Sequence, residues 1–134
     1  MKKPRWVPLH VVLALHKECI ATFGGSDGVR DEGLLESALA RPENLSCYGT
    51  PTLHELAAAY GYGLAKNHPF IDGNKRTAFL ATAVFLMDND FQPVVNEAEV
   101  VTTITALAAS QLTEAEFAQW LKQSFKPVKT KPAK

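Results

Sequence analysis

Cysteine, net charge and long apolar runs are all scarce in this sequence. Its 2 cysteines, Cys19 and Cys47, are too few for a disulfide framework, and neither has a CxxC partner or a histidine at zinc-site spacing. No run approaches the roughly 18 apolar residues of a membrane span. The apolar stretch from Val7 to Leu15 is interrupted by Pro8 and His10 and lacks the cleavage site of an export signal. These absences predict a cytoplasmic protein with reduced thiols and no membrane partner.

Net charge and chain length argue against nucleic-acid binding and against a second domain. The 14 basic and 14 acidic residues cancel, so no overall field attracts nucleic acid, and direct nucleic-acid binding is not expected. With 134 residues, 46% of them hydrophobic, the chain is long enough for one core, and we predict a single domain over residues 1–125. The remaining residues 126–134 contain 4 Lys and 2 Pro, a composition typical of a disordered basic tail.

Helical periodicity is present from the first apolar stretch onward. Apolar positions predict a helix over residues 8–23 that ends at Gly24. Asp31 is a suitable N-cap for a second, short helix, which Pro42 is expected to stop. Residues 42–51 are rich in turn-forming residues and are typical of an irregular connection or a small hairpin.

Two capping boxes mark later helix starts. Thr52 with Glu55 predicts a helix to about Asn67, and Thr113 with Glu116 predicts one to about Lys122. Residues between these two helices are expected to form a buried central helix over 75–88, a brief strand or turn over 91–95 and a further helix over 96–109. The patterns therefore predict an all-α fold, a compact bundle of about six helices.

The densest group of functional side chains lies between the third helix and the central one. The run His68-Pro69-Phe70-Ile71-Asp72-Gly73-Asn74-Lys75-Arg76 holds an imidazole, a carboxylate, an amide and two cations. Gly73 permits close approach of a ligand to the backbone, and the free amides of the following helix start favour phosphate oxygens. Lys75 and Arg76 add full charges there, and Asn74 adds a further donor.

The other side chains of this run indicate what the phosphate site is for. Asp72 would repel a bare phosphate but is suited to hold Mg²⁺ beside a nucleotide. His68 carries the side chain most often used as a general base, and Phe70 and Ile71 are expected to plug the core and anchor the loop. Singly, each of these residues is ordinary loop chemistry. Their combination predicts transfer of a phosphate-containing group to a hydroxyl.

The run resembles the Fic signature, in which His, any residue, Phe, any residue, Asp or Glu, Gly and Asn precede basic residues. It is nearer to the Doc branch, the death-on-curing toxins, and the upstream run from Gly28 to Pro42 is also similar to that branch. AMP-transferring Fic enzymes have Gly-Arg after the Asn and a second Arg three residues on, whereas this chain has Lys75-Arg76 and then Phe79. The resemblance covers residues 8 to about 122 and implies a Fic-type bundle.

For function, the resemblance implies the toxin of a toxin–antitoxin system. Such a toxin is a protein kinase that uses ATP and Mg²⁺ to phosphorylate a threonine or serine hydroxyl of a translation factor, elongation factor Tu, and so arrests translation. The resemblance makes His68 the general base, Phe70 a structural anchor and Asp72 the Mg²⁺ ligand. Lys66 stands where the Doc prototype has Arg, so it is a candidate accessory cation, with a solvated surface Lys as the alternative. The phosphate-binding residues it implies are Gly73, Asn74, Lys75 and Arg76.

The resemblance also implies partners. The segment 42–52 corresponds to the flap that pairs with a target peptide in Fic relatives, which would place Tyr48, Gly49 and Thr50 near the substrate; for Tyr48 the alternative is a packed aromatic. The sequence contains no inhibitory helix of the Fic type. Inhibition would then come from a separate antitoxin whose disordered tail folds on the toxin.

Three other functions remain open on the sequence. An AMP-transferase on the same fold is opposed by Lys75 and Phe79. A metal-dependent nuclease, in which the same residue types would activate water, is opposed by the zero net charge. A binding module that keeps the loop without catalysis is the third.

Overall fold

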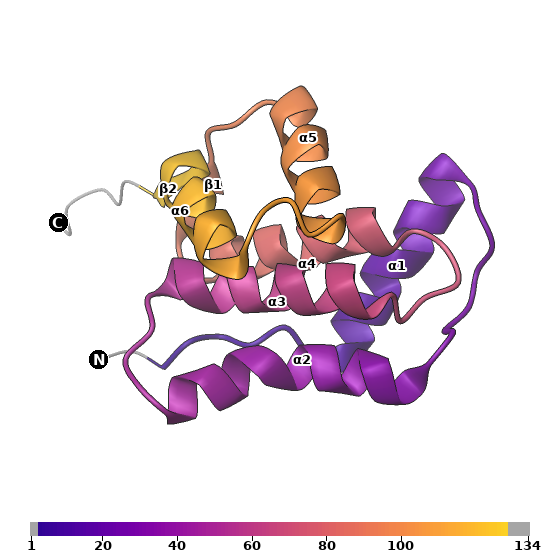
Figure 1. Ribbon diagram of the computed structural model, residues 1–134, viewed down its shortest axis with the longest axis horizontal. Helices are drawn as coiled ribbons and strands as arrows, with labels where there is room; N and C mark the ends of the chain where they lie inside the picture. The colour runs from indigo at the N-terminus through magenta and orange to yellow at the C-terminus, as the bar shows by residue number, and fades with distance from the viewer. Residues whose placement is uncertain (1–2, 129–134) are drawn as a thin grey trace, which may run out of the picture.

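The computed structural model describes residues 3–128, and within them the chain forms a helical bundle with one small antiparallel sheet (Figure 1). The predicted all-α fold class is confirmed. The elements in chain order are α1 (Leu9–Phe23), α2 (Glu32–Cys47), α3 (Leu53–Asn67), α4 (Asn74–Asp88), β1 (Phe91–Pro93), α5 (Glu97–Ala108), α6 (Glu114–Ser124) and β2 (Phe125–Pro127).

The helix starts follow the local sequence signals. The Asp31 carboxylate accepts a hydrogen bond of 2.9 Å from the Leu34 N–H at the start of α2. Both predicted capping boxes are formed, at Thr52 for α3 and at Thr113 for α6. The side chain of Asn96 caps α5 in the same way. Because each cap satisfies main-chain donors within three residues, sequence alone is enough to locate these helix starts.

Helices α3 and α4 form the centre of the bundle. Helix α3 packs against α2, α4, α5 and α6, and α4 packs against α1, α3 and α5. Gly61 makes this close packing possible, because a Cβ atom there would lie only 2.6 Å from Thr82 Oγ1 and 2.7 Å from the Phe117 ring. The central position predicted for α4 is confirmed, and α3 shares it.

Helix α2 is longer than predicted, because Pro42 does not stop it. The helix continues through the buried Pro42 to Cys47. Proline removes one main-chain donor, and the burial of Pro42 in a helix that packs on α3 offsets this loss. Residues 42–47 are therefore helical, and no strand forms in the described segment 42–52.

The two short strands lie elsewhere. Phe91 pairs with Pro127 and Pro93 with Phe125, which confirms the brief strand predicted near residues 91–95. Lys126 lies in β2, and the Val128 N–H donates to the Asp90 carbonyl oxygen at 2.8 Å. The tail predicted to begin at residue 126 is thus ordered as far as 128. Residues 129–134 lie outside the described part of the chain, so their disorder stays a prediction.

Two further findings concern the cysteines and the length of the helices. Cys19 is buried, as free cysteine usually is, and Cys47 is exposed. None of the helices within residues 3–128 is long and apolar enough to cross a membrane.

The connections between helices gather at two ends of the bundle. In Figure 1 the α1–α2 connection and the α3–α4 connection lie side by side at the right, whereas the α2–α3 connection lies at the opposite end of α3. The run from His68 to Arg76 begins in the α3–α4 connection and continues into α4. The segment that faces this run is therefore residues 24–31, which we call the α1–α2 loop.

Candidate active site

Two left-handed residues bracket the α3–α4 connection. His68 follows the last residue of α3 with φ 48° and ψ 55°, and Gly73 precedes α4 with φ 79° and ψ 17°. Glycine adopts this conformation without steric cost, whereas histidine does so at a cost. The His68 side chain is exposed, and no described residue hydrogen-bonds to its imidazole. The ring is therefore free to accept a proton from a substrate.

Phe70 and Asn74 close the loop from inside. Phe70 is 1% exposed, so its predicted burial is confirmed. Its N–H donates to Asn74 Oδ1 at 2.9 Å, and Asn74 Nδ2 donates back to the Phe70 carbonyl at 3.0 Å. The Asn74 side chain, which is 8% exposed, thus faces into the loop. Because the Asn74 side chain is engaged with the Phe70 main chain, its main-chain N–H is the donor left for a phosphate. The phosphate contact itself stays a prediction.

Ile71 does not plug the core as expected. Its side chain is 52% exposed. Phe70 forms an antiparallel bridge with Val29 of the α1–α2 loop, and in such extended backbone consecutive side chains point to opposite sides. Since Phe70 faces the bundle, Ile71 faces away.

The α1–α2 loop binds the α3–α4 connection along its main chain. The Arg30 N–H donates to the Pro69 carbonyl at 2.7 Å, and the Ile71 N–H donates to the Gly28 carbonyl at 3.1 Å. These bonds hold the two loops together as a short two-stranded pairing around the Val29–Phe70 bridge.

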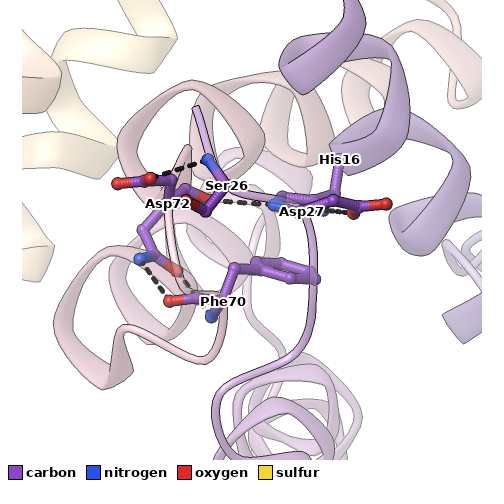
Figure 2. A network of polar contacts seen from close by, with 6 residues as sticks. His16, Ser26, Asp27, Phe70 and Asp72 are labelled. Atoms are coloured by element: carbon purple, nitrogen blue, oxygen red, sulfur yellow. Dashed lines mark hydrogen bonds and ion pairs between the residues drawn. The ribbon is translucent and has the colours of Figure 1, made fainter. Parts of the chain in front are cut away.

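Asp72 is held from two sides, as Figure 2 shows. Its carboxylate Oδ2 accepts a hydrogen bond of 2.8 Å from the Ser26 N–H. Its main-chain oxygen pairs at 2.8 Å with Nε2 of His16 from α1. The other carboxylate oxygen, Oδ1, accepts no hydrogen bond from the described residues. One oxygen of Asp72 is thus fixed and the other is left for a ligand.

His16 is a site residue that sequence reasoning missed. It is 2% exposed and stacks on the Phe70 ring with a centroid distance of 3.9 Å and an interplanar angle of 8°. Because a carbonyl oxygen only accepts, Nε2 must carry the hydrogen that it shares with Asp72. Nδ1 lies 3.7 Å from Asp27 Oδ1 on the α1–α2 loop (Figure 2). The available signal was a lone histidine on the buried face of α1, between Val12 and Cys19.

A cavity of about 320 Å³ opens beside this network. No side chain of the described residues caps α4, so the N–H groups of its first turn are free. Arg76 reaches over the Phe23 ring, with Cζ 3.6 Å from the centroid, which keeps its guanidinium near the cavity. The cavity is lined by Cys19, Ile20, Phe23, Gly24, Gly25, Asp72, Gly73 and Arg76.

Lys75 borders a second hollow, which shares Phe23 and Arg76 with the first. This groove of about 530 Å³ lies between α4 and α5, and Phe79 and Val101 are among its apolar walls. The two predicted cations therefore stand side by side at the start of α4, each beside a hollow that a ligand could enter. This arrangement suits a ligand with both phosphates and an apolar or aromatic part.

The residues predicted for the flap lie at the other end of the bundle. Tyr48 is 89% exposed and, with Gly49 and Thr50, lines a groove of about 800 Å³ between α2, α3 and α6. Tyr48 lies just before the start of α3, whereas His68 follows its end, and the 15 residues of α3 span about 22 Å between them. The structure therefore does not bring Tyr48, Gly49 and Thr50 to the motif. The loop that lies against the motif is instead the α1–α2 loop, through the Val29–Phe70 bridge.

Lys66 is also occupied elsewhere. Its Nζ donates to the Ser110 hydroxyl in the turn after α5. Its predicted role as an accessory cation stays a prediction. Among the described residues, no group of three or more His, Cys, Asp or Glu is arranged to hold a metal ion.

Comparison with known proteins assigns the chain to a family. The Fic/DOC family model matches residues 6–86, more than half of the chain. The chain belongs to the Fic/DOC family. The match includes both loops of the candidate site and ends in α4, so α5, α6 and the sheet lie beyond it.

Two relatives place this Fic/DOC chain in the predicted Doc branch. It is 49% identical over 73 residues to "Toxin Doc" of Mycolicibacterium smegmatis, a match that covers 52% of this chain and 55% of that protein. It is 30% identical over 115 residues to "Protein kinase doc" of Escherichia phage P1, covering 85% of this chain and 90% of that protein. The first match thus spans about half of its relative, and the second extends beyond α4.

Proposed function

We propose that this Fic/DOC chain is the toxin of a toxin–antitoxin pair and transfers the γ-phosphate of ATP to a threonine or serine hydroxyl of elongation factor Tu. One observation carries the proposal. An exposed, unpartnered imidazole at His68 and a carboxylate at Asp72 are held by one paired loop, at the uncapped start of a helix that bears Lys75 and Arg76. This set supplies a base, a metal carboxylate and a phosphate site.

The residues present fit a magnesium nucleotide. Mg²⁺ usually takes one or two carboxylates together with substrate phosphates, and Asp72 offers one oxygen that the Ser26 N–H does not use. Mg²⁺ would supply charge neutralisation at the phosphates when bound. The free N–H groups of α4 and the Arg76 guanidinium, which line or adjoin the cavity of about 320 Å³, would bind phosphate oxygens.

His68 would perform the proton transfer. Its imidazole accepts the proton of the attacking hydroxyl while the main chain of the loop holds the ring in place. The rest of the rate enhancement would come from positioning and from positive groups directed at the phosphoryl oxygens.

The choice of γ-phosphate rests on the motif and on one relative. Lys75 replaces the Gly of AMP-transferring enzymes, and Phe79 replaces their second Arg. Phe79 contributes an apolar wall to the groove beside Lys75, so a second guanidinium is missing where those enzymes have one. The name of the relative "Protein kinase doc" also favours phosphate transfer, and that protein is similar to this chain over 90% of its own length.

The proposal includes a partner and a location. An antitoxin with a disordered tail would silence the site by folding over the exposed His68 and Asp72. A kinase of elongation factor Tu would act in the cytoplasm.

Labelled ATP tests the reaction. Wild-type protein, His68→Ala and the control His10→Ala, which changes an exposed histidine of α1 outside the site, are incubated with elongation factor Tu, Mg²⁺ and ATP labelled at the α or γ phosphate. We expect γ label on the factor with the wild type and His10→Ala, and none with His68→Ala. Transfer of α label would replace the kinase by an AMP-transferase, and no transfer of either label would overturn both.

A further inference from the structure

The backbone of His68 is in a conformation that needs support. Its φ of 48° lies in the left-handed region, and it precedes Pro69, which restricts the backbone of the residue before it. His68 also ends α3, where carbonyl groups lack helical partners. The imidazole itself is exposed and no described residue hydrogen-bonds to it, so the protein hydrogen bonds that help to place the ring are those of the main chain.

Arg30 supplies that support from the α1–α2 loop. Its Nε donates to the His68 carbonyl at 2.7 Å, and its Nη2 donates to the Asn67 carbonyl at 2.9 Å. Its own N–H and that of Asp31 donate to the Pro69 carbonyl at 2.7 and 3.1 Å. Arg30 and Asp31 therefore hold three consecutive carbonyls, one before the His68 Cα and two after it.

The chemistry of the contact favours a guanidinium. The carbonyls at a helix C-terminus carry partial negative charge, and a cation placed there is attracted to them. A planar guanidinium has several donors in a rigid fork and can serve two carbonyls at once, whereas an ammonium is a compact point charge on a flexible stem. The Arg30 side chain is exposed, so it is not part of the core that folds the bundle.

We propose that Arg30 is a positioning residue for the reaction: its guanidinium fixes the main chain of His68 and thereby the position of the catalytic imidazole. The inference rests on the proposed function of His68 as the general base. It adds a residue of the α1–α2 loop to the machinery, although that residue touches neither the imidazole nor the phosphate cavity.

Kinetics of matched variants test this role. Arg30→Ala removes the fork, Arg30→Lys keeps one charge, and Arg41→Ala is the control, because Arg41 pairs with Glu114 and lies over the Tyr62 ring rather than at the α3–α4 connection. Since a small misplacement of a catalytic group can cost about 100-fold in rate, we expect kcat of Arg30→Ala to fall by about that factor with little change in KM for ATP. Arg30→Lys should retain part of the lost rate, and Arg41→Ala should keep the wild-type kcat.

Chemical rescue separates positioning from folding. Guanidinium ion, added well below denaturing concentrations, should restore part of the kcat of Arg30→Ala, because it can occupy the space of the missing side chain. Wild-type kcat in Arg30→Ala would overturn the inference. A fall in kcat that neither Arg30→Lys nor guanidinium reverses, or an equal fall in Arg41→Ala, would overturn it as well.

A measurement without substrate keeps this inference distinct from the proposed function. The protein has 4 histidines, so the ring signals of ¹³C-labelled histidine are few enough to assign. We expect the His68 signal to shift or broaden in Arg30→Ala while the His54 and His10 signals stay in place. If the wild type transfers no label, the proposed function fails, and this spectrum still decides whether Arg30 positions His68. An unchanged His68 signal would refute the positioning.

Discussion

The two ends of helix α3 carry connections of different composition and different structure. At one end, the α2–α3 connection contains Tyr48, Gly49 and Thr50, which border the larger groove, of about 800 Å³. At the other end, the α3–α4 connection borders a cavity of about 320 Å³. The first is exposed. The second is paired along its main chain with the α1–α2 loop.

This difference shows that volume is a poor guide to the site here. The smaller cavity has polar groups from three segments converging on it, with Asp72 held by Ser26 and His16. In the larger groove, Glu55 and Glu116 are engaged in capping their own helices, and Arg41 is paired with Glu114. A catalytic site needs groups that are held in fixed positions and are free to meet a ligand, and within residues 3–128 the motif end has such groups.

The largest effect on the transfer rate should be seen when one residue at each end of α3 is mutated and the two variants are compared. We expect His68→Ala to lower phosphate transfer by about 10²- to 10⁴-fold, the usual contribution of a general base. Tyr48→Ala, at the other end of α3, should leave the transfer rate unchanged, as measured with γ-labelled ATP. A large loss of rate in Tyr48→Ala would return the flap to the α2–α3 connection and break the comparison.

A smaller effect, on stability, is expected at Asn74. Asn74→Ala leaves the buried N–H and carbonyl of Phe70 without their partners, so we expect it to lower the free energy of unfolding by about 1–3 kcal/mol in urea titrations. Asn44→Ala, an exposed change at the far end of α2, is the matched control and should be close to neutral. Equal stabilities of the two variants would contradict the role of Asn74 in closing the loop.

Substitution of His16 should change the Mg²⁺ concentration needed for transfer more than it changes the stability of the fold. His16→Phe keeps a ring to stack on Phe70 but loses the donor to the Asp72 carbonyl, whereas His16→Gln keeps a donor and loses the ring. Hydrogen bonds behind a metal ligand typically change metal affinity by about 10-fold or more. We therefore expect His16→Phe to need about tenfold more Mg²⁺ for half-maximal transfer, with a smaller change in His16→Gln. The reverse order would show that stacking alone matters.

The smallest effect concerns a histidine near the opposite end of α3. Burial lowers the pKa of His54 below its ordinary value of 6.5; the hydrogen bond with the Phe125 carbonyl opposes this, and the charges of Lys122 and Lys126 add to it. Since the unfolded chain binds the proton more readily, the contribution of His54 to stability is present above the unfolded pKa and is lost as the pH falls below it.

Thermal melting across this pH range tests the assignment. We expect Tm of the wild type to decrease as the pH drops below about 6.5, and His54→Gln, which keeps a donor for Phe125, to show a weaker decrease. Identical slopes in the two proteins would assign the pH dependence to other groups. The transfer rate at neutral pH should be the same in both, because His54 lies away from the motif.

Much of the fold was accessible from the sequence, and so was the chemical content of the site. Both capping boxes, the Asp31 cap, the end of α1 at Gly24 and the buried Phe70 follow from short-range rules. The resemblance of the run from His68 to Arg76 to the Fic signature agrees with the family match. Pro42 and Ile71 were local failures, because α2 tolerates a buried proline within it and Ile71 faces away from the core.

What the sequence by itself determined are features that depend on neighbours within a few residues: helix ends, the glycine needed at Gly73, and the set of reactive groups in the motif. Only the tertiary structure decided which loop faces that motif, why His16 is buried, and which carbonyls Arg30 holds. These contacts join residues that are 37 to 56 positions apart. Such pairings depend on how α1, α3 and α4 pack, and no local pattern encodes that packing.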